Sequence, residues 1–319
     1  MFMGMRRILG ALMIAGFGAA CVLGPPGPRG AHAAEHRVLV LVSHSAPPYS
    51  DALGGFRDYL RQRGIAVTLD VHSLDGDGSK AAAIVQEARR SKPGLVFTLG
   101  SLATQVAAQG LGRDTSIVAT LVVSADELRR APNMTGVALE FPIDTQFQWL
   151  RRILPAARTV GVLYNPAENQ PRIAAATPVA ARMGLTVEAQ AVPSPRDLPL
   201  ALESLGRRVD VLWSVPDPLV LNAQTAQQVL LFSLNQRLPF VGLSSAWVKA
   251  GALYALEWDY VDLGAQCGQL AGQILQGTLP AAIPFASPRK VVYVINQRTA
   301  THLRLELPES LLRGARELF

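Results

Sequence analysis

Small hydroxyl groups, amides and carboxylates follow several apolar segments of this chain, and these are the side chains that could hold a charged solute. Gly100 and Ser101 follow one apolar segment and open a predicted helix that contains Thr104. Free backbone N–H groups at a helix start, beside small hydroxyls, suit a carboxylate. The simpler alternative is a serine N-cap that needs no ligand.

Two further loops with polar side chains follow apolar segments in the second half of the chain. Asn165, Glu168 and Asn169 lie just after one of them, and they supply a carboxylate and amides. The alternative is an Asn-Pro turn with a solvated glutamate. Asp217 is flanked by two prolines, so its backbone is stiff and its acid could hold an ammonium group. Its alternative role is to cap the next helix.

Aromatic side chains add two candidates for a ligand site. Tyr49 ends the polar stretch that begins at Ser43, and we predict that both residues belong to the ligand site. Tyr49 could stack on a ligand or only cap the helix that follows. Trp258 lies where the chain is expected to cross between its two halves, so we expect it to line a cleft. The alternative for Trp258 is packing at an internal interface.

Motifs of common enzymes are missing from the sequence. There is no G-x-S-x-G, H-E-x-x-H or Walker A sequence, and the glycine-rich patches do not form G-x-G-x-x-G. Beyond residues 1–33, the histidines are scattered and lack the spacing of metal ligands: His36, His44, His72 and His302. We therefore predict a protein that is not an enzyme and needs no cofactor or metal. The enzyme alternative is a hydrolase that uses Ser43 or His44.

Strands and helices alternate along the chain, in two series. The first series predicts strands over 37–42, 65–71, 94–99 and 116–121, with helices over 49–63, 79–91 and 101–109 between them. The second predicts strands over 159–164, 186–191, 209–214, 239–241 and 252–257, with helices over 144–154, 172–183, 195–206, 219–236 and 264–276. This alternation predicts an α/β fold with doubly wound parallel sheets.

The repeat of element order predicts two lobes. Ligands of open α/β sheets bind beyond the carboxyl ends of the strands. In a two-lobed clamshell these ends face each other across a cleft that closes about a hinge. The alternatives are one large continuous sheet or an enzyme dimer with an external site.

Residues 1–33 are typical of a secretory leader. Arg6 and Arg7 precede a short apolar stretch, and the small-x-small site at 31–33 predicts cleavage after Ala33. We therefore expect a periplasmic protein. Cys21 follows Gly-Ala-Ala and half resembles a lipoprotein box, so lipid anchoring at Cys21 is the alternative.

Charge and cysteine content exclude other classes. The net charge is +6, and part of it belongs to the leader. Basic residues are not interleaved with aromatic ones, so nucleic acid is not expected as a partner. Without the leader, Cys267 is the only cysteine, and we expect it to be a small buried residue of a helix.

The order of several short motifs resembles the substrate-binding proteins of ABC transporters in the tryptophan/tyrosine-type group. The matching stretches are 135–137, 154–155, 160–169, 238–242, 251–253, 259–264, 274–280, 295–296 and Ala300. The resemblance implies the type I periplasmic-binding-protein fold, with a first lobe of 35–140 plus 259–285 and a second of 141–258 plus 286–319. Three hinge segments would join the lobes.

The resemblance also implies a function and a set of site residues. It implies capture of a small polar or aromatic, amino-acid-like solute by a monomer, and delivery to an ABC permease in the inner membrane. The ligand-facing positions would be Ser101 and Thr104 in the first lobe, and Asn165, Glu168, Asn169 and Asp217 in the second. Where the family often has Asp-Pro, this chain has Ser124, which we include among the predicted ligand-binding residues. The alternative function is a ligand-sensing receptor that signals to a membrane partner.

Overall fold

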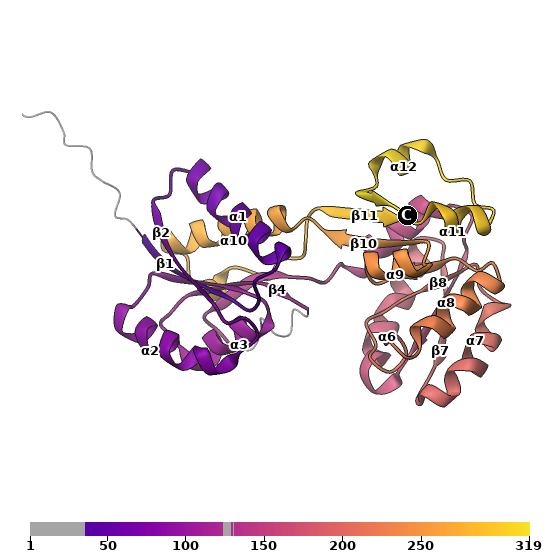
Figure 1. Ribbon diagram of the computed structural model, residues 1–319, viewed down its shortest axis with the longest axis horizontal. Coiled ribbons are helices and arrows are strands. Elements are labelled where there is room, and N and C mark those ends of the chain that lie inside the picture. Colours follow the sequence, from indigo (N-terminus) through magenta and orange to yellow (C-terminus); the bar gives the residue numbers. More distant parts are fainter. Residues whose placement is uncertain (1–35, 124–128, 130) are drawn as a thin grey trace, which may run out of the picture. The chain divides into compact units, whose positions relative to one another are not determined.

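The structure is a computed structural model that describes residues 36–123, 129 and 131–319 (Figure 1). The chain divides into a unit of residues 1–34 and a unit of residues 35–319. The predicted leader and Ser124 lie outside the described residues.

Parallel strands build the first sheet, in the order β2-β1-β3-β4-β5. They are β1 (His36–Val42), β2 (Val67–Ser73), β3 (Leu95–Leu99), β4 (Ile117–Val122) and β5 (Met134–Ala138). Every residue of β3, β4 and β5 is buried, as expected when helices cover both faces of a parallel sheet.

Helices pack on both faces of this sheet, which confirms the doubly wound prediction. Helices α1 (Pro47–Gln62) and α10 (Tyr260–Leu275) cover one face. Helices α2 (Ala81–Ser91) and α3 (Ser101–Gly110) cover the other, as Figure 1 shows. A short 3-10 helix, Gly78–Lys80, precedes α2. Helix α10 is far from α1 in sequence, so a late segment of the chain completes the first core.

The second sheet has the order β12-β11-β10-β9-β8-β6-β7. Its strands are β6 (Thr159–Tyr164), β7 (Thr186–Ala191), β8 (Val211–Trp213), β9 (Phe240–Gly242), β10 (Tyr254–Trp258), β11 (Val291–Ile295) and β12 (Glu317–Leu318). The series β7-β6-β8-β9-β10 repeats the strand order of the first sheet. Only β10 and β11 pair antiparallel among the described strands. The chain leaves this sheet at the end of β10 through the second hinge segment and returns through the third into β11, so the two strands run in opposite directions.

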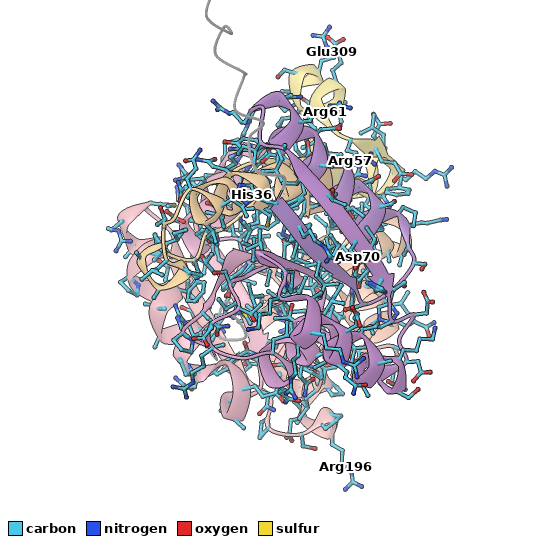
Figure 2. All side chains as sticks on the ribbon, turned by 90° about the vertical axis from the view of Figure 1, so that its left-hand side faces the viewer. His36, Arg57, Arg61, Asp70, Arg196 and Glu309 are labelled. Atoms are coloured by element: carbon cyan, nitrogen blue, oxygen red, sulfur yellow. The ribbon has the colours of Figure 1, made fainter. Side chains whose placement is uncertain are left out.

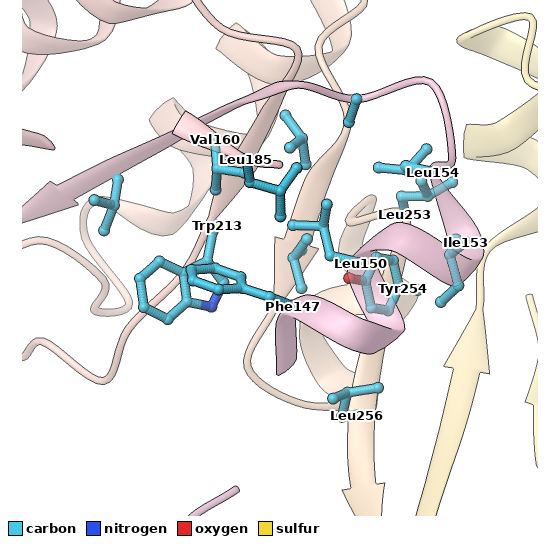
Figure 3. Packing of buried hydrophobic residues seen from close by; sticks show 14 of the residues in the cluster. Phe147, Leu150, Ile153, Leu154, Val160, Leu185, Trp213, Leu253, Tyr254 and Leu256 are labelled. Carbon is cyan, nitrogen blue, oxygen red and sulfur yellow. The ribbon is translucent and has the colours of Figure 1, made fainter. Parts of the chain in front are cut away.

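Two apolar clusters hold helices on the faces of the second sheet. Helices α5 (Ile143–Ile153), α6 (Pro166–Arg182), α11 (Gln297–His302) and α12 (Glu309–Gly314) contribute to the larger cluster. Figure 3 shows Phe147 and Leu150 of α5 beside Trp213 and Tyr254 in this cluster. Helices α7 (Leu198–Gly206), α8 (Ala226–Asn235) and α9 (Ser245–Ala250) contribute to the other cluster.

The chain passes between the two sheets three times: between β5 and α5, between β10 and α10, and between α10 and β11. These hinge segments contact one another. The Phe141 ring of the first stacks on the ring of Trp258, the last residue of β10, at a centroid distance of 5.5 Å. Ion pairs Asp259–Lys290 and Asp262–Arg289 join the second segment and the first turn of α10 to the third segment.

Helix starts are where the sequence prediction fails most clearly. Helix α6 begins at Pro166 instead of residue 172, because Pro166 suits the first helical turn and the Asn165 side chain accepts a hydrogen bond from Ala167 N. Helix α8 begins at Ala226, since 219–225 instead form turns held by Asp217 and Asn222. Helix α10 begins at Tyr260 instead of 264, because Asp259 caps it. Strands β5, β11 and β12 and helices α9, α11 and α12 were not predicted.

Charged side chains lie mainly outside the cores. Figure 2 shows Arg196 and Glu309 projecting away from the body of the protein. Within the described part of the chain, none of the helices has both the length and the apolar character needed to span a bilayer.

Candidate functional site

Each sheet reverses its direction of winding at one place, and the predicted polar loops lie there. Strands β1 and β3 are neighbours in the first sheet, so the loops after them diverge at its carboxyl edge. Strands β6 and β8 are the corresponding neighbours in the second sheet. Open α/β sheets bind ligands at such switch points. Ser43 and Ser101 follow β1 and β3, and Asn165 and Asp217 follow β6 and β8.

A hydrogen bond to Ser43 joins the two loops of the first switch point. The side-chain oxygen of Ser43 accepts a hydrogen bond of 2.9 Å from Ala103 N in the first turn of α3, and the residue is 2% exposed. Gly100 allows this approach because its φ is +94° and a Cβ there would lie 2.5 Å from Ser43 Oγ. The Ser43 hydroxyl oxygen is therefore already hydrogen-bonded within the protein.

The Thr104 hydroxyl is also hydrogen-bonded within the protein, whereas the Ser101 hydroxyl is free to bind a solute. The Thr104 hydroxyl donates to Gly100 O at 2.9 Å and bonds to Thr98 Oγ1 at 2.9 Å, and its side chain is buried. Ser101 is exposed at the start of α3, and its hydroxyl has no hydrogen-bond partner among the described residues. Of the hydroxyls predicted in this loop, Ser101 is the one that a solute can reach.

Tyr49 lies beside the same switch point. It is half-buried, and its ring meets the His44 ring edge-on at 5.9 Å. Burial raises the pKa of the Tyr49 phenol, so this hydroxyl is neutral at physiological pH. Together with Ser43, Ser101 and Thr104, Tyr49 forms the first-lobe part of the predicted site.

Asp217 organises the second switch point. Its Oδ2 accepts hydrogen bonds from Asn165 N (2.6 Å) and Asn169 Nδ2 (3.0 Å), and its Oδ1 accepts from Leu219 N (3.0 Å) and Val220 N (3.1 Å). The residue is 2% exposed. A carboxylate has about four acceptor positions, so these donors fill it. A ligand ammonium could bind Asp217 only by displacing one of them.

The other predicted residues of this loop have structural roles or face outward. The Asn165 side chain caps α6, and Asn169 is buried and also donates to Pro216 O at 3.1 Å. Glu168 is exposed in the first turn of α6, where an acid favours the positive helix end. The structure thus brings Asn165, Asn169 and Asp217 into one network.

A cavity of about 340 Å³ lies beside this network, at the ends of β8, β9 and β10 and the first hinge segment. Its walls are mainly aromatic and aliphatic, and they are formed by Val123, Leu139, Glu140, Phe141, Gln146, Arg172, Trp213, Ser214, Pro216, Val241, Gly242, Leu243, Tyr254, Leu256 and Trp258. Ligand pockets typically combine such apolar walls with a few polar groups. Of the predicted site residues, Trp258 lines this cavity.

Indole groups form part of the cavity wall and differ in their hydrogen bonding. Trp213 Nε1 donates to Gln146 Oε1 at 2.9 Å. Trp258 Nε1 is buried and finds no acceptor among the described residues. Because an unpaired buried donor is costly, an acceptor on a bound molecule would relieve this cost.

One ion pair lies in the cavity wall. Arg172 Nη2 donates to Glu140 Oε1 at 2.8 Å, with the side chains 26% and 37% exposed. Glu140 comes from the first hinge segment and Arg172 from α6. The cavity therefore presents one negative and one positive group next to stacked aromatic rings.

Sequence reasoning missed most of this cavity. Glu140, Phe141 and Arg172 lie away from the predicted strand ends, and no local motif marks them. Trp213 could have been found, because it lies at the carboxyl end of the predicted strand 209–214, four residues before Asp217. For metals, the described residues contain no group of three or more His, Cys, Asp or Glu side chains that could hold an ion.

Two doubly wound sheets, three hinge segments and polar loops at both switch points define a two-lobed solute-binding protein of the clamshell type. The chain belongs to the family described as ABC transporter substrate binding protein, which it matches over residues 36–319. This confirms the resemblance found in the sequence.

Individual relatives agree with this family. The chain is 23% identical over 279 residues to a tyrosine-binding protein of Clostridioides difficile strain R20291, covering 83% of this chain and 79% of the relative. It is 26% identical to the solved ABC domain from Streptococcus pneumonia in complex with L-Trp, covering 88% and 100% of the two chains, with a TM-score of 0.55. A ligand-free, open substrate-binding protein from Clostridium difficile is 21% identical, with a TM-score of 0.73 and coverage of 88% and 98%, which shows the shared fold.

Proposed function

We propose that this protein captures a small amino-acid-like solute with an aromatic side chain between its lobes and delivers it to an ABC permease in the inner membrane. The lobes would comprise 35–140 plus 259–285 and 141–258 plus 286–319. The observation that carries the proposal is the cavity, which combines aromatic walls with one acid and one base. Relatives that are named for tyrosine or contain L-Trp support the aromatic class.

Capture would be a binding event without bond chemistry. The aromatic part of the solute would pack on Phe141, Trp213 and Trp258, since ring stacking adds to the gain from apolar burial. Ser101 would contribute a hydroxyl from the first lobe. Asp217 and Asn169 would position the second-lobe loop without touching the solute.

A ligand panel tests this function. The purified protein is heated with each of the twenty amino acids, and each ligand that raises the melting temperature is then titrated by calorimetry. We expect L-tryptophan or L-tyrosine to give the largest shift, because a ligand at about 100 times its Kd adds about 2.7 kcal/mol to apparent stability. Absence of any shift across the panel, with no bound small molecule released on denaturation, would contradict the proposal.

We further propose that the protein works in the periplasm after cleavage behind Ala33. The basic and apolar pattern of residues 1–33 supports export. Mass spectrometry of the mature N-terminus tests this. A mass that begins at Ala34 is expected, whereas a lipid-modified Cys21 would mean a tethered receptor.

A further inference from the structure

We propose that the Glu140–Arg172 pair reads the two charges of a zwitterionic solute, with Glu140 meeting the ammonium group and Arg172 meeting the carboxylate. This inference rests on the proposed function, because it concerns the same cavity. It assigns the recognition of the ammonium group to Glu140 instead of Asp217.

The geometry leaves both partners able to accept a ligand. Only Arg172 Nη2 is bonded to Glu140, through Oε1. The remaining guanidinium nitrogens of Arg172 and Oε2 of Glu140 have no hydrogen-bond partner among the described residues. Both side chains line the cavity and keep partial contact with solvent. A solute can therefore enter beside the pair without breaking a saturated network.

Other acidic side chains near the site already accept hydrogen bonds from groups of the protein. Asp217 accepts four hydrogen bonds and is buried. Glu257 accepts a hydrogen bond from Ser245 N and lies 3.9 Å from Arg316, and it does not line the cavity. Among the described residues that line the cavity, Glu140 is the one acid and Arg172 is the one base.

The pair also lies at the correct place relative to the aromatic wall. Glu140 directly precedes Phe141, whose ring stacks on Trp258 with an interplanar angle of 6°. A ring that packs on this wall would keep its attached ammonium and carboxylate groups near Glu140 and Arg172. The unpartnered Trp258 N–H adds a donor for an oxygen of the same solute.

Charge compensation gives the pair its selectivity. In the unliganded protein, Arg172 balances Glu140. A zwitterion supplies a new partner to each residue, so no charge is left unpaired when the cavity loses its water. An analogue without the ammonium group would bring a second carboxylate to the pair, so that Arg172 alone would face two negative charges, which is costly in a site of low polarity.

The test compares an amino acid with its analogues that lack one charge. The probes are L-tryptophan, indole-3-propionate, which lacks the ammonium group, and tryptamine, which lacks the carboxylate; if the panel selects L-tyrosine, its corresponding analogues replace them. We expect the wild-type protein to bind each analogue about tenfold to hundredfold more weakly than the amino acid, the effect of one charge-assisted hydrogen bond. Titration calorimetry gives the Kd values.

Variants then assign the two charges. In Glu140→Gln, the preference for the amino acid over the analogue without an ammonium group is expected to fall to within about threefold, while the preference over tryptamine persists. Arg172→Gln is expected to show the reverse pattern. Glu188→Gln is the matched control, because Glu188 forms a similar pair with Arg208 (3.1 Å) far from the cavity wall. Melting temperatures confirm that each variant is folded.

The outcomes separate the two proposals. If the wild-type protein binds none of the amino acids, the proposed function fails and this inference fails with it. If the wild-type protein binds an amino acid but Glu140→Gln and Arg172→Gln keep both preferences, only this inference is overturned. The same holds if either analogue binds the wild-type protein as tightly as the amino acid.

Discussion

Among single residues, Asp217 accepts four hydrogen bonds through its side chain, so we expect it to hold the loops of the second switch point in place. Replacing it with alanine leaves Asn165 N and Asn169 Nδ2 without their acceptor. We expect Asp217→Ala to lower the free energy of unfolding by about 2–4 kcal/mol, as for the loss of hydrogen bonds to a buried charge. Denaturant unfolding measures this change.

The control for Asp217 is an exposed acid. Asp51→Ala on α1 removes a carboxylate at the surface and should change stability by less than about 0.5 kcal/mol. If Asp217→Ala is as stable as Asp51→Ala, then Asp217 does not brace the loops.

Cys267 is chemically inert for a reason that only its surroundings supply. The residue is fully buried in α10, and burial raises the pKa of its thiol to about 12, against smaller opposing effects of Thr120 and Val137. The thiolate is the reactive form, so a thiol reagent at pH 8 should not label Cys267 in the folded protein. Protein carrying Cys21→Ser isolates this thiol. Rapid labelling before unfolding would contradict the prediction.

At the scale of elements, the contact between α1 and α10 brings together two helices that are about two hundred residues apart in the sequence. Both helices contribute to the same apolar core. The helices approach so closely that a Cβ at Gly264 would lie 1.8 Å from Ala52 O, and one at Gly55 would lie 1.9 Å from Val261 O. No side chain fits at either place.

Gly264→Ala should therefore destabilise the protein by about 1–3 kcal/mol or more, because the backbones must separate. Gly54→Ala on α1 is the matched control, since a Cβ there meets nothing within 4 Å. That substitution should be neutral or stabilising by up to about 1 kcal/mol, because alanine favours helix. Equal melting temperatures of the two variants would refute the close contact.

At the scale of the whole molecule, the ion pairs of the hinge couple the second hinge segment to the third. Burial is the largest single effect on Asp259 and Asp262 and opposes their ionisation. The hydrogen bonds from Lys290 and Arg289, further hydrogen bonds from Asp262 N and Gln266, and the nearby positive charges together lower the pKa of both carboxyls. A depressed folded-state pKa means that the stabilisation is present above the unfolded value and is lost as pH falls through the folded value.

We expect Arg289→Gln combined with Lys290→Gln to lower the melting temperature by a few degrees at pH 7 and low salt. The deficit should shrink below about pH 4, where the unfolded parent begins to take up protons that its folded carboxyls, with their lowered pKa values, still resist. It should also shrink in about 0.5 M salt, which screens exposed cations. A deficit that is constant across pH and salt would show that these pairs do not act through charge.

The fold was largely predictable because the apolar segments are regular. Segments such as 159–164 and 186–191 became strands with these bounds, and the repeated βα order gave two doubly wound sheets. Helix starts at prolines and the short strands β11 and β12 were missed, because capping and pairing with distant strands outweigh local pattern there.

The sequence by itself determined the alternation of strands and helices and the polar loops that follow the strands, because both depend on local periodicity. The class of protein followed from the resemblance of its short motifs to a known family. Only the tertiary structure decided which polar groups remain available. Asp217, Thr104 and Ser43 bond to groups within the protein, whereas Ser101 stays exposed. It also decided that Glu140, Phe141 and Arg172 meet in one cavity, because a hinge segment and α6 become neighbours only when the second lobe folds.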